Sequence, residues 1–277
     1  MFKLLKNNFK ITNDCIILAT PLIIFLSIIS WYFNYAKDAI DNIPKLLLAI
    51  ITMIVIISGS SSAWFYMVKK TIKLANTVFI FDKDRTKAFQ DLLKSLHFGI
   101  GKLFLPFLGI ISITSLIYIA ILFIITLSVN KYVGTIDTNL LSTINVLLSS
   151  DELIQEINDL PTEQIMFLTI WYGITYLSTL VLSFFTMLWI PEVVYCEKNP
   201  FKALKYSIQK IIHAFPKTFA LFAYINILAI LISILNTVLM FHPITYFLVL
   251  VLYYYFIVYI VVLLFSYYEQ TFIKNEE

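Results

Sequence analysis

The sequence predicts an all-α fold, a polytopic bundle of six transmembrane helices, and three observations support this prediction. First, 60% of the 277 residues are hydrophobic and only 13% are charged, whereas a soluble domain carries about 25% charged residues. Second, six apolar segments are each long enough to cross a bilayer as a helix, which takes about 20 residues, and they contain no Lys, Arg, Asp, Glu or His. Third, the basic residues are concentrated on one side of these segments.

The six predicted spans are residues 15–35, 46–68, 103–128, 165–190, 218–241 and 244–267. Lysines precede the first span, as in a signal peptide, but the apolar segment is long for one and no small-x-small cleavage site follows it. We therefore interpret it as a retained span. The last two spans are separated by His242 and Pro243, and together they are about twice the length that one crossing needs.

The charge distribution predicts the orientation of the chain. If both termini are cytoplasmic, 17 of the 20 basic residues lie on the inner side, and only Lys37, Lys45 and Lys131 lie outside. Loops rich in Lys and Arg stay in the cytoplasm. We therefore expect a multi-pass protein of the cell membrane, a bacterial inner membrane being the expected location, with both termini inside.

A basic amphipathic helix is predicted on the inner side, before the fifth span. Asn199 can cap this helix and Pro200 suits its first position. Apolar residues then recur at helical spacing, with lysines on another face. Pro216 is expected to interrupt the helix. Such a helix is expected to lie in the inner headgroup layer with its lysines facing anionic lipid.

The same pattern precedes the third span, 115 residues earlier. The matching residues are Lys87, Ala88, Lys102, Phe104 and Phe107, against Lys202, Ala203, Lys217, Phe219 and Phe222. Here Gly99 and Gly101 are expected to break the helix in place of Pro216. Residues 2–10 give a shorter third match. These matches predict a single membrane domain of three parallel units, each a surface helix and two spans, at 1–68, 69–190 and 191–277. Independent occurrence of similar helices is the alternative.

The outer segment 129–164 is predicted to form one or two short amphipathic helices, because leucines and isoleucines recur in it at helical spacing. Two interpretations remain open: a lid over the bundle, or helices that rest in the outer interface.

Uncharged polar residues lie within the spans. Asn226, Ser233 and Asn236 share one stripe of span five, and this stripe either packs against another helix or lines a polar path for a solute. Four tyrosines lie in the middle of span six, where their hydroxyl groups need partners. We expect hydrogen bonds from them to span two or five, an aromatic-lined cavity being the alternative. Glu192, at the inner end of span four, is expected to be an interfacial anchor.

The sequence lacks the motifs of common active sites. It contains no HExxH, GxSxG or Walker motif, and its three histidines are isolated. Cys15 and Cys196 are far apart and are expected to be reduced thiols. We therefore expect no catalytic, cofactor or metal site. The basic segments lie between membrane spans, so we expect them to contact lipid and not nucleic acid.

The plan of the chain resembles that of poorly characterised bacterial six-span families, related to the membrane domain found beside glycerophosphoryl diester phosphodiesterase. This resemblance rests on a basic helix that begins at a proline and contains small residues (Pro200, Ala203 and Ser207). The helix leads through a break into a span. It implies an integral membrane protein without an established activity. The soluble phosphodiesterase domain is absent from this sequence, so the resemblance does not imply that activity.

Two functional hypotheses follow. The first is a non-enzymatic protein that organises the membrane or assists another complex, and whose basic helices bind anionic phospholipid or a protein partner, which includes a second copy of the chain. Its expected surface is formed by Lys87, Lys94, Lys102, Lys202, Lys205, Lys210 and Lys217. The second is a permease-like transport subunit whose inner helices dock a cytoplasmic ATPase and whose span-five stripe lines the path.

Overall fold

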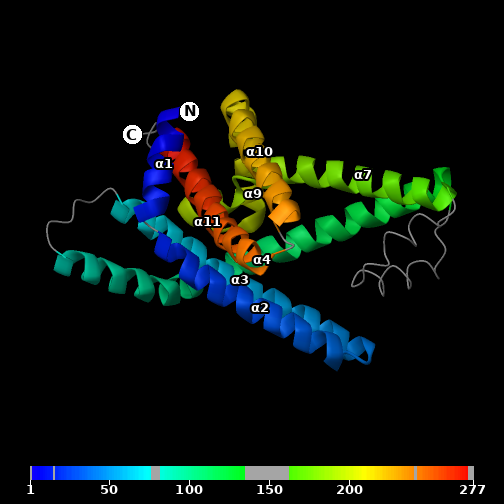
Figure 1. Ribbon diagram of the computed structural model, residues 1–277, viewed down its shortest axis with the longest axis horizontal. Helices are drawn as coiled ribbons and strands as arrows, with labels where there is room; N and C mark the ends of the chain where they lie inside the picture. The colour runs from blue at the N-terminus through cyan, green and yellow to red at the C-terminus, as the bar shows by residue number, and fades with distance from the viewer. Residues whose placement is uncertain (1, 15, 76–81, 135–161, 240–241, 274–277) are drawn as a thin grey trace. The chain divides into compact units, whose positions relative to one another are not determined.

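The computed structural model describes residues 2–14, 16–75, 82–134, 162–239 and 242–273, and within these ranges the chain is almost entirely helical and contains no strand (Figure 1). This confirms the predicted all-α fold. The elements are α1 (Phe2–Asp14), the 3-10 turn η1 (Ile16–Leu18), α2 (Ala19–Ala39), α3 (Ile43–Ala75), α4 (Asp82–Tyr132), α7 (Thr162–Thr186), α8 (Trp189–Tyr195), α9 (Pro200–His213), α10 (Phe215–Leu239), α11 (Pro243–Tyr268) and the π-helical turn η2 (Glu269–Ile273).

Six helical segments of the described chain are long and apolar enough to cross a membrane, and each of them overlaps one of the six predicted spans. They are Ile16–Lys37, Ile43–Ala75, Gln90–Tyr132, Thr162–Tyr195, Phe215–Leu239 and Ile244–Ile273. Large apolar side chains are exposed along them; Trp31 is 70% exposed and Leu105 is 73% exposed. Exposed apolar surface of this extent is typical of a protein that contacts lipid. The protein is a membrane-spanning helical protein.

The chain divides into two compact units, Met1–Ser112 with Phe185–Glu277, and Ile113–Phe184. The second unit holds the later part of α4 and most of α7, which pack around Ile125, Val129 and Phe167. These compact units do not test the predicted threefold repeat, which stays a prediction. Most of the predicted outer helices, residues 135–161, lie outside the described residues.

The first unit is built around α11, which contacts α1, α2, α3, α8 and α10. Figure 1 shows α1 beside α11 and α2 beside α3. Three rings from three helices form part of its core: Phe65 of α3 stacks with Phe107 of α4 at 5.4 Å and with Phe265 of α11 at 5.9 Å between ring centres. Aromatic stacking of this kind adds to the energy of burial.

A span-six tyrosine is paired as predicted with span five. The hydroxyl oxygens of Tyr259 in α11 and Tyr224 in α10 lie 3.0 Å apart. A second tyrosine of α11, Tyr255, donates to Asn13 Oδ1 of α1 at 2.8 Å, which the sequence did not predict. These hydrogen bonds give the phenol groups the partners that an apolar environment requires.

The predicted helix break at Gly99 and Gly101 is wrong, because α4 continues through both residues. Gly99 instead lets α4 approach α3 closely. A Cβ at this position would lie 2.8 Å from the backbone oxygen of Ser62 and 2.9 Å from the Cα of Ala63. Small residues permit such contact between membrane helices. The break predicted at Pro216 is confirmed, since α9 ends at His213 and α10 begins at Phe215.

Candidate functional site

Helix α9, which is predicted to lie on the inner side, begins at the predicted cap. The side chain of Asn199 accepts hydrogen bonds from the backbone N–H groups of Phe201, at 3.1 Å, and Lys202, at 3.2 Å. Pro200 occupies the first turn, where its missing N–H would have no helical partner. The indole of Trp189 in α8 donates to the Pro200 carbonyl at 2.9 Å. The cap and this indole together fix the position of α9 beside α8.

Helix α9 presents three different faces. One face is buried against the protein and consists of Ala203, Ser207 and Ile211. A second face exposes apolar side chains, with Phe201 68% exposed and Ile212 61% exposed. A third face exposes Lys202, Lys205, Gln209 and His213. A helix with a protein-facing, an apolar and a basic face fits the boundary between headgroups and acyl chains.

A buried ion pair joins α8 to α9. The side chain of Glu192 is only 2% exposed, and its Oε2 accepts a hydrogen bond from Lys210 Nζ at 2.8 Å. The same carboxylate oxygen accepts from the Tyr268 hydroxyl, which in turn accepts from Lys210 Nζ at 2.6 Å. The three side chains therefore form a closed triangle, which we call the Glu192 cluster. The Sγ of Cys196 lies 3.3 Å from the Tyr268 hydroxyl.

The Glu192 cluster changes two expectations. The sequence assigned Lys210 to an exposed lipid or partner surface, but its amine points inward to a carboxylate. Glu192 is not an exposed interfacial anchor, because its side chain is buried within the protein. A carboxylate at this depth is stable only with a partner that satisfies its charge. Lys210 and Tyr268 supply that partner, so both residues hold the fold together.

A second group of charges forms a basic hollow of about 380 Å³ between α3, α4 and α8. Its lysines are Lys69, Lys70, Lys73, Lys102 and Lys198, and no Asp or Glu of the described chain lines it. Two tyrosine rings hold some of the ammonium groups in place. The Nζ of Lys69 lies 4.6 Å from the centre of the Tyr195 ring, and the Nζ atoms of Lys70 and Lys102 each lie 5.8 Å from the centre of the Tyr66 ring.

The like charges of the basic hollow repel one another. Lys69 and Lys73 are four residues apart on α3, and a like-charged pair at this spacing costs a helix about 0.2–0.5 kcal/mol. Lys69 is the best anchored, since its Nζ donates to the carbonyl of Val194 at 2.8 Å. A concave surface of one sign concentrates ions of the opposite sign. The basic hollow is therefore suited to an anion.

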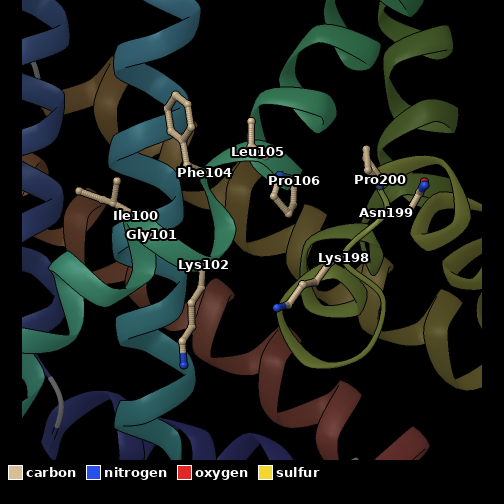
Figure 2. A pocket seen from close by; sticks show the side chains of 9 residues that line it. All are labelled: Ile100, Gly101, Lys102, Phe104, Leu105, Pro106, Lys198, Asn199 and Pro200. Atoms are coloured by element: carbon tan, nitrogen blue, oxygen red, sulfur yellow. The ribbon is translucent and has the colours of Figure 1, made fainter.

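An apolar hollow of about 620 Å³, whose lining side chains are shown in Figure 2, shares two lysines with the basic hollow. Lys102 and Lys198 line both hollows. The other lining residues are Ile100, Gly101, Phe104, Leu105, Pro106, Asn199 and Pro200. In Figure 2, Lys102 comes from α4 and Lys198 from the segment before α9. The two lysines thus mark the boundary between a cationic surface and an apolar one.

The other residues of the predicted lipid or partner surface are exposed: Lys87, Lys94, Lys102, Lys202, Lys205 and Lys217. Of these, only Lys102 enters the basic hollow. The predicted polar path does not border either hollow. Ser233 and Asn236 are exposed on α10, and the Asn226 amide donates to the Phe222 carbonyl of its own helix at 2.8 Å.

The sequence interpretation missed four lysines of the basic hollow: Lys69, Lys70, Lys73 and Lys198. One signal was available, since Lys69, Lys70 and Lys73 lie within five residues of each other directly after the second span. A cluster of lysines at the cytoplasmic end of a span is typical of a segment that binds anionic lipid. Their meeting with Lys102 and Lys198 depends on helix packing, which the sequence does not contain.

Comparison of the chain with known proteins finds no matching family model, no matching curated protein and no matching solved structure. The resemblance to bacterial six-span families therefore stays an expectation.

Proposed function

We propose that this chain is a non-enzymatic integral membrane protein whose inner basic surface binds anionic phospholipid. On this proposal it organises lipid in the inner leaflet or supports another complex there. The basic surface consists of the exposed lysines of α9 and of the early part of α4. Anionic headgroups attract such lysines with about 1 kcal/mol for each residue near the membrane surface.

The three-faced arrangement of α9 supports the proposal. Its inward face is fixed by the Glu192 cluster, so the helix cannot roll freely about its axis. The exposed apolar side chains of Phe201 and Ile212 then occupy one side and the exposed Lys202 and Lys205 another. This geometry lets the apolar face enter the acyl layer while the lysines contact headgroups.

The proposal is tested by reversing two charges of α9. The double variant Lys202→Glu/Lys205→Glu keeps the Glu192 cluster intact, because neither residue belongs to it. The protein is extracted with its native lipid into polymer discs, and the co-extracted lipids and proteins are quantified by mass spectrometry. We expect the unmodified chain to be enriched in anionic lipid and the variant to lose most of this enrichment.

The matched control is Lys37→Glu/Lys131→Glu, which reverses two lysines assigned to the outer side. This control should leave the enrichment unchanged. Equal enrichment in the unmodified chain and the α9 variant would overturn the proposal, as would equal loss in the variant and the control. A stoichiometric ATPase in the discs would instead favour the permease-like subunit.

A further inference from the structure

We infer that the basic hollow and the apolar hollow together form a binding site for one phospholipid molecule with an anionic headgroup that carries no cation. The inference rests on the proposed function and names the class of lipid and its place. The phosphate would lie among Lys70, Lys102 and Lys198, and an acyl chain would lie along the apolar hollow.

The lining of the basic hollow is suited to binding the phosphate of the lipid. Five lysines line it, and no carboxylate of the described chain does. Lysine binds phosphate as a point charge and donates up to three hydrogen bonds. A bound phosphate would offset the repulsion between neighbouring ammonium groups, and it would add charge-assisted hydrogen bonds that are stronger than neutral ones.

The same lining discriminates between headgroups. A zwitterionic headgroup brings an ammonium group, which needs a carboxylate or a free aromatic face. No carboxylate of the described residues lines the hollow, and the nearby carboxylate of Glu269 already accepts a hydrogen bond from the Tyr195 hydroxyl at 3.1 Å. The rings of Tyr66 and Tyr195 already lie close to lysine ammonium groups, at 5.8 Å and 4.6 Å from the ring centres. The site therefore favours a glycerol headgroup or a bare phosphate over ethanolamine or choline.

The apolar hollow indicates a lipid and not a free phosphate ester. Lys102 and Lys198 line both hollows, so an anion held by them is in direct reach of apolar walls. Leu105 is 73% exposed in this hollow and Ile100 is 43% exposed. Covering these side chains with an acyl chain removes them from contact with headgroups and water. A soluble phosphate ester would leave this surface uncovered.

The test counts lipids that stay bound to the purified full-length chain. Phosphatidylglycerol or phosphatidylethanolamine with identical acyl chains is titrated into detergent micelles, and native mass spectrometry reports the bound lipid. We expect one phosphatidylglycerol to be retained tightly and phosphatidylethanolamine to be retained weakly. The variant Lys70→Gln/Lys102→Gln/Lys198→Gln should bind phosphatidylglycerol roughly 100-fold more weakly, since about 1 kcal/mol for each lysine is about a fivefold factor in affinity.

The matched control is Lys37→Gln/Lys45→Gln/Lys131→Gln, which removes three exposed lysines that lie outside both hollows and outside the proposed basic surface. It should retain the single lipid. Retention that is the same in both triple variants, or an equal loss in both, overturns the inference. If the α9 charge reversal abolishes bulk anionic enrichment but no single lipid is retained by the unmodified chain, the inference fails and the proposed function stands.

A second pair of measurements tests the apolar part and separates lipid from free phosphate. The variant Ile100→Trp/Leu105→Trp fills the apolar hollow without changing its charge. It should weaken lipid retention about tenfold, which corresponds to the free energy of burying roughly two CH₂ groups. Leu48→Trp, at an exposed leucine of α3, should have no effect. Glycerol 3-phosphate should not displace the lipid at equal concentration. Displacement at equal concentration would show that the site takes a soluble phosphate ester and would overturn the lipid assignment.

Discussion

The Glu192 cluster shows how a single residue decides which lysines are available to a ligand. Lys210 and Lys205 lie five residues apart on one helix, yet one amine is bound to a buried carboxylate and the other is exposed. Taking a carboxylate out of water is costly unless a cation and further hydrogen bonds replace the water. The Tyr268 hydroxyl provides the additional hydrogen bond. Charge reversal at Lys210 would therefore report on folding and not on lipid.

The change Lys210→Met is expected to destabilise the protein by about 3 kcal/mol, because it leaves the Glu192 charge buried without its cation. The exposed Lys202→Met should cost less than about 0.5 kcal/mol. Thermal unfolding in one detergent measures both. The double variant Glu192→Gln/Lys210→Met should recover much of the loss, since a neutral amide can still accept from Tyr268. Equal stability of the two single variants would contradict a stabilising role for the ion pair.

At the scale of elements, α3 and α4 meet at a point where a side chain would not fit. Gly99 faces the backbone of Ser62 and Ala63, whereas a Cβ at Gly101 would have no atom within 4 Å. Two glycines that look equivalent in the sequence therefore have different roles. The close approach at Gly99 also brings Lys102, one turn further along α4, toward the lysines of α3 that line the basic hollow.

The change Gly99→Ala is expected to destabilise the protein by about 1–3 kcal/mol, because the new methyl group meets backbone atoms that cannot move aside cheaply. Gly101→Ala is the matched control and should be neutral or stabilising by up to about 1 kcal/mol, since alanine favours a helix. Thermal unfolding again measures both. Should Gly99→Ala also be tolerated, the two helices are not in the contact described here.

At the scale of the whole molecule, the charge distribution predicts one inner and one outer surface. Lys205 is assigned to the inner side and Asp41 to the outer side, and both side chains are exposed. An even number of spans also predicts that both termini share one side. Because the basic hollow lies at the ends of α3 and α8, next to segments that are assigned to the inner side, this predicted orientation decides which leaflet supplies the lipid.

Cysteine labelling in intact cells tests the orientation. With Cys15 and Cys196 replaced by serine, the variant Asp41→Cys should react with a membrane-impermeant maleimide from outside. Lys205→Cys should react only after the cells are permeabilised, because the positive-inside rule places its segment in the cytoplasm. The opposite pattern would reverse the topology and place the basic surface in the outer leaflet.

Much of the fold was predictable because membrane spans are a local property. The six apolar segments and the cap at Asn199 follow from residues that are adjacent in the chain, and the structure confirms both. The break at Pro216 was predicted for the same reason. The break at Gly99 was predicted wrongly, because glycine either ends a helix or lets two helices touch, and a single sequence does not distinguish these roles.

The sequence by itself determined that this chain crosses a membrane with six helices and carries its lysines next to particular span ends. Length, apolar content and charge order are sufficient for this, since the bilayer acts on each segment separately. Only the tertiary structure decided which lysines are available to bind a ligand. It placed Lys210 against Glu192 and gathered Lys69, Lys70, Lys73, Lys102 and Lys198 around one hollow. The physical reason is that burial and charge pairing depend on residues far apart in the chain, which meet only when the helices pack.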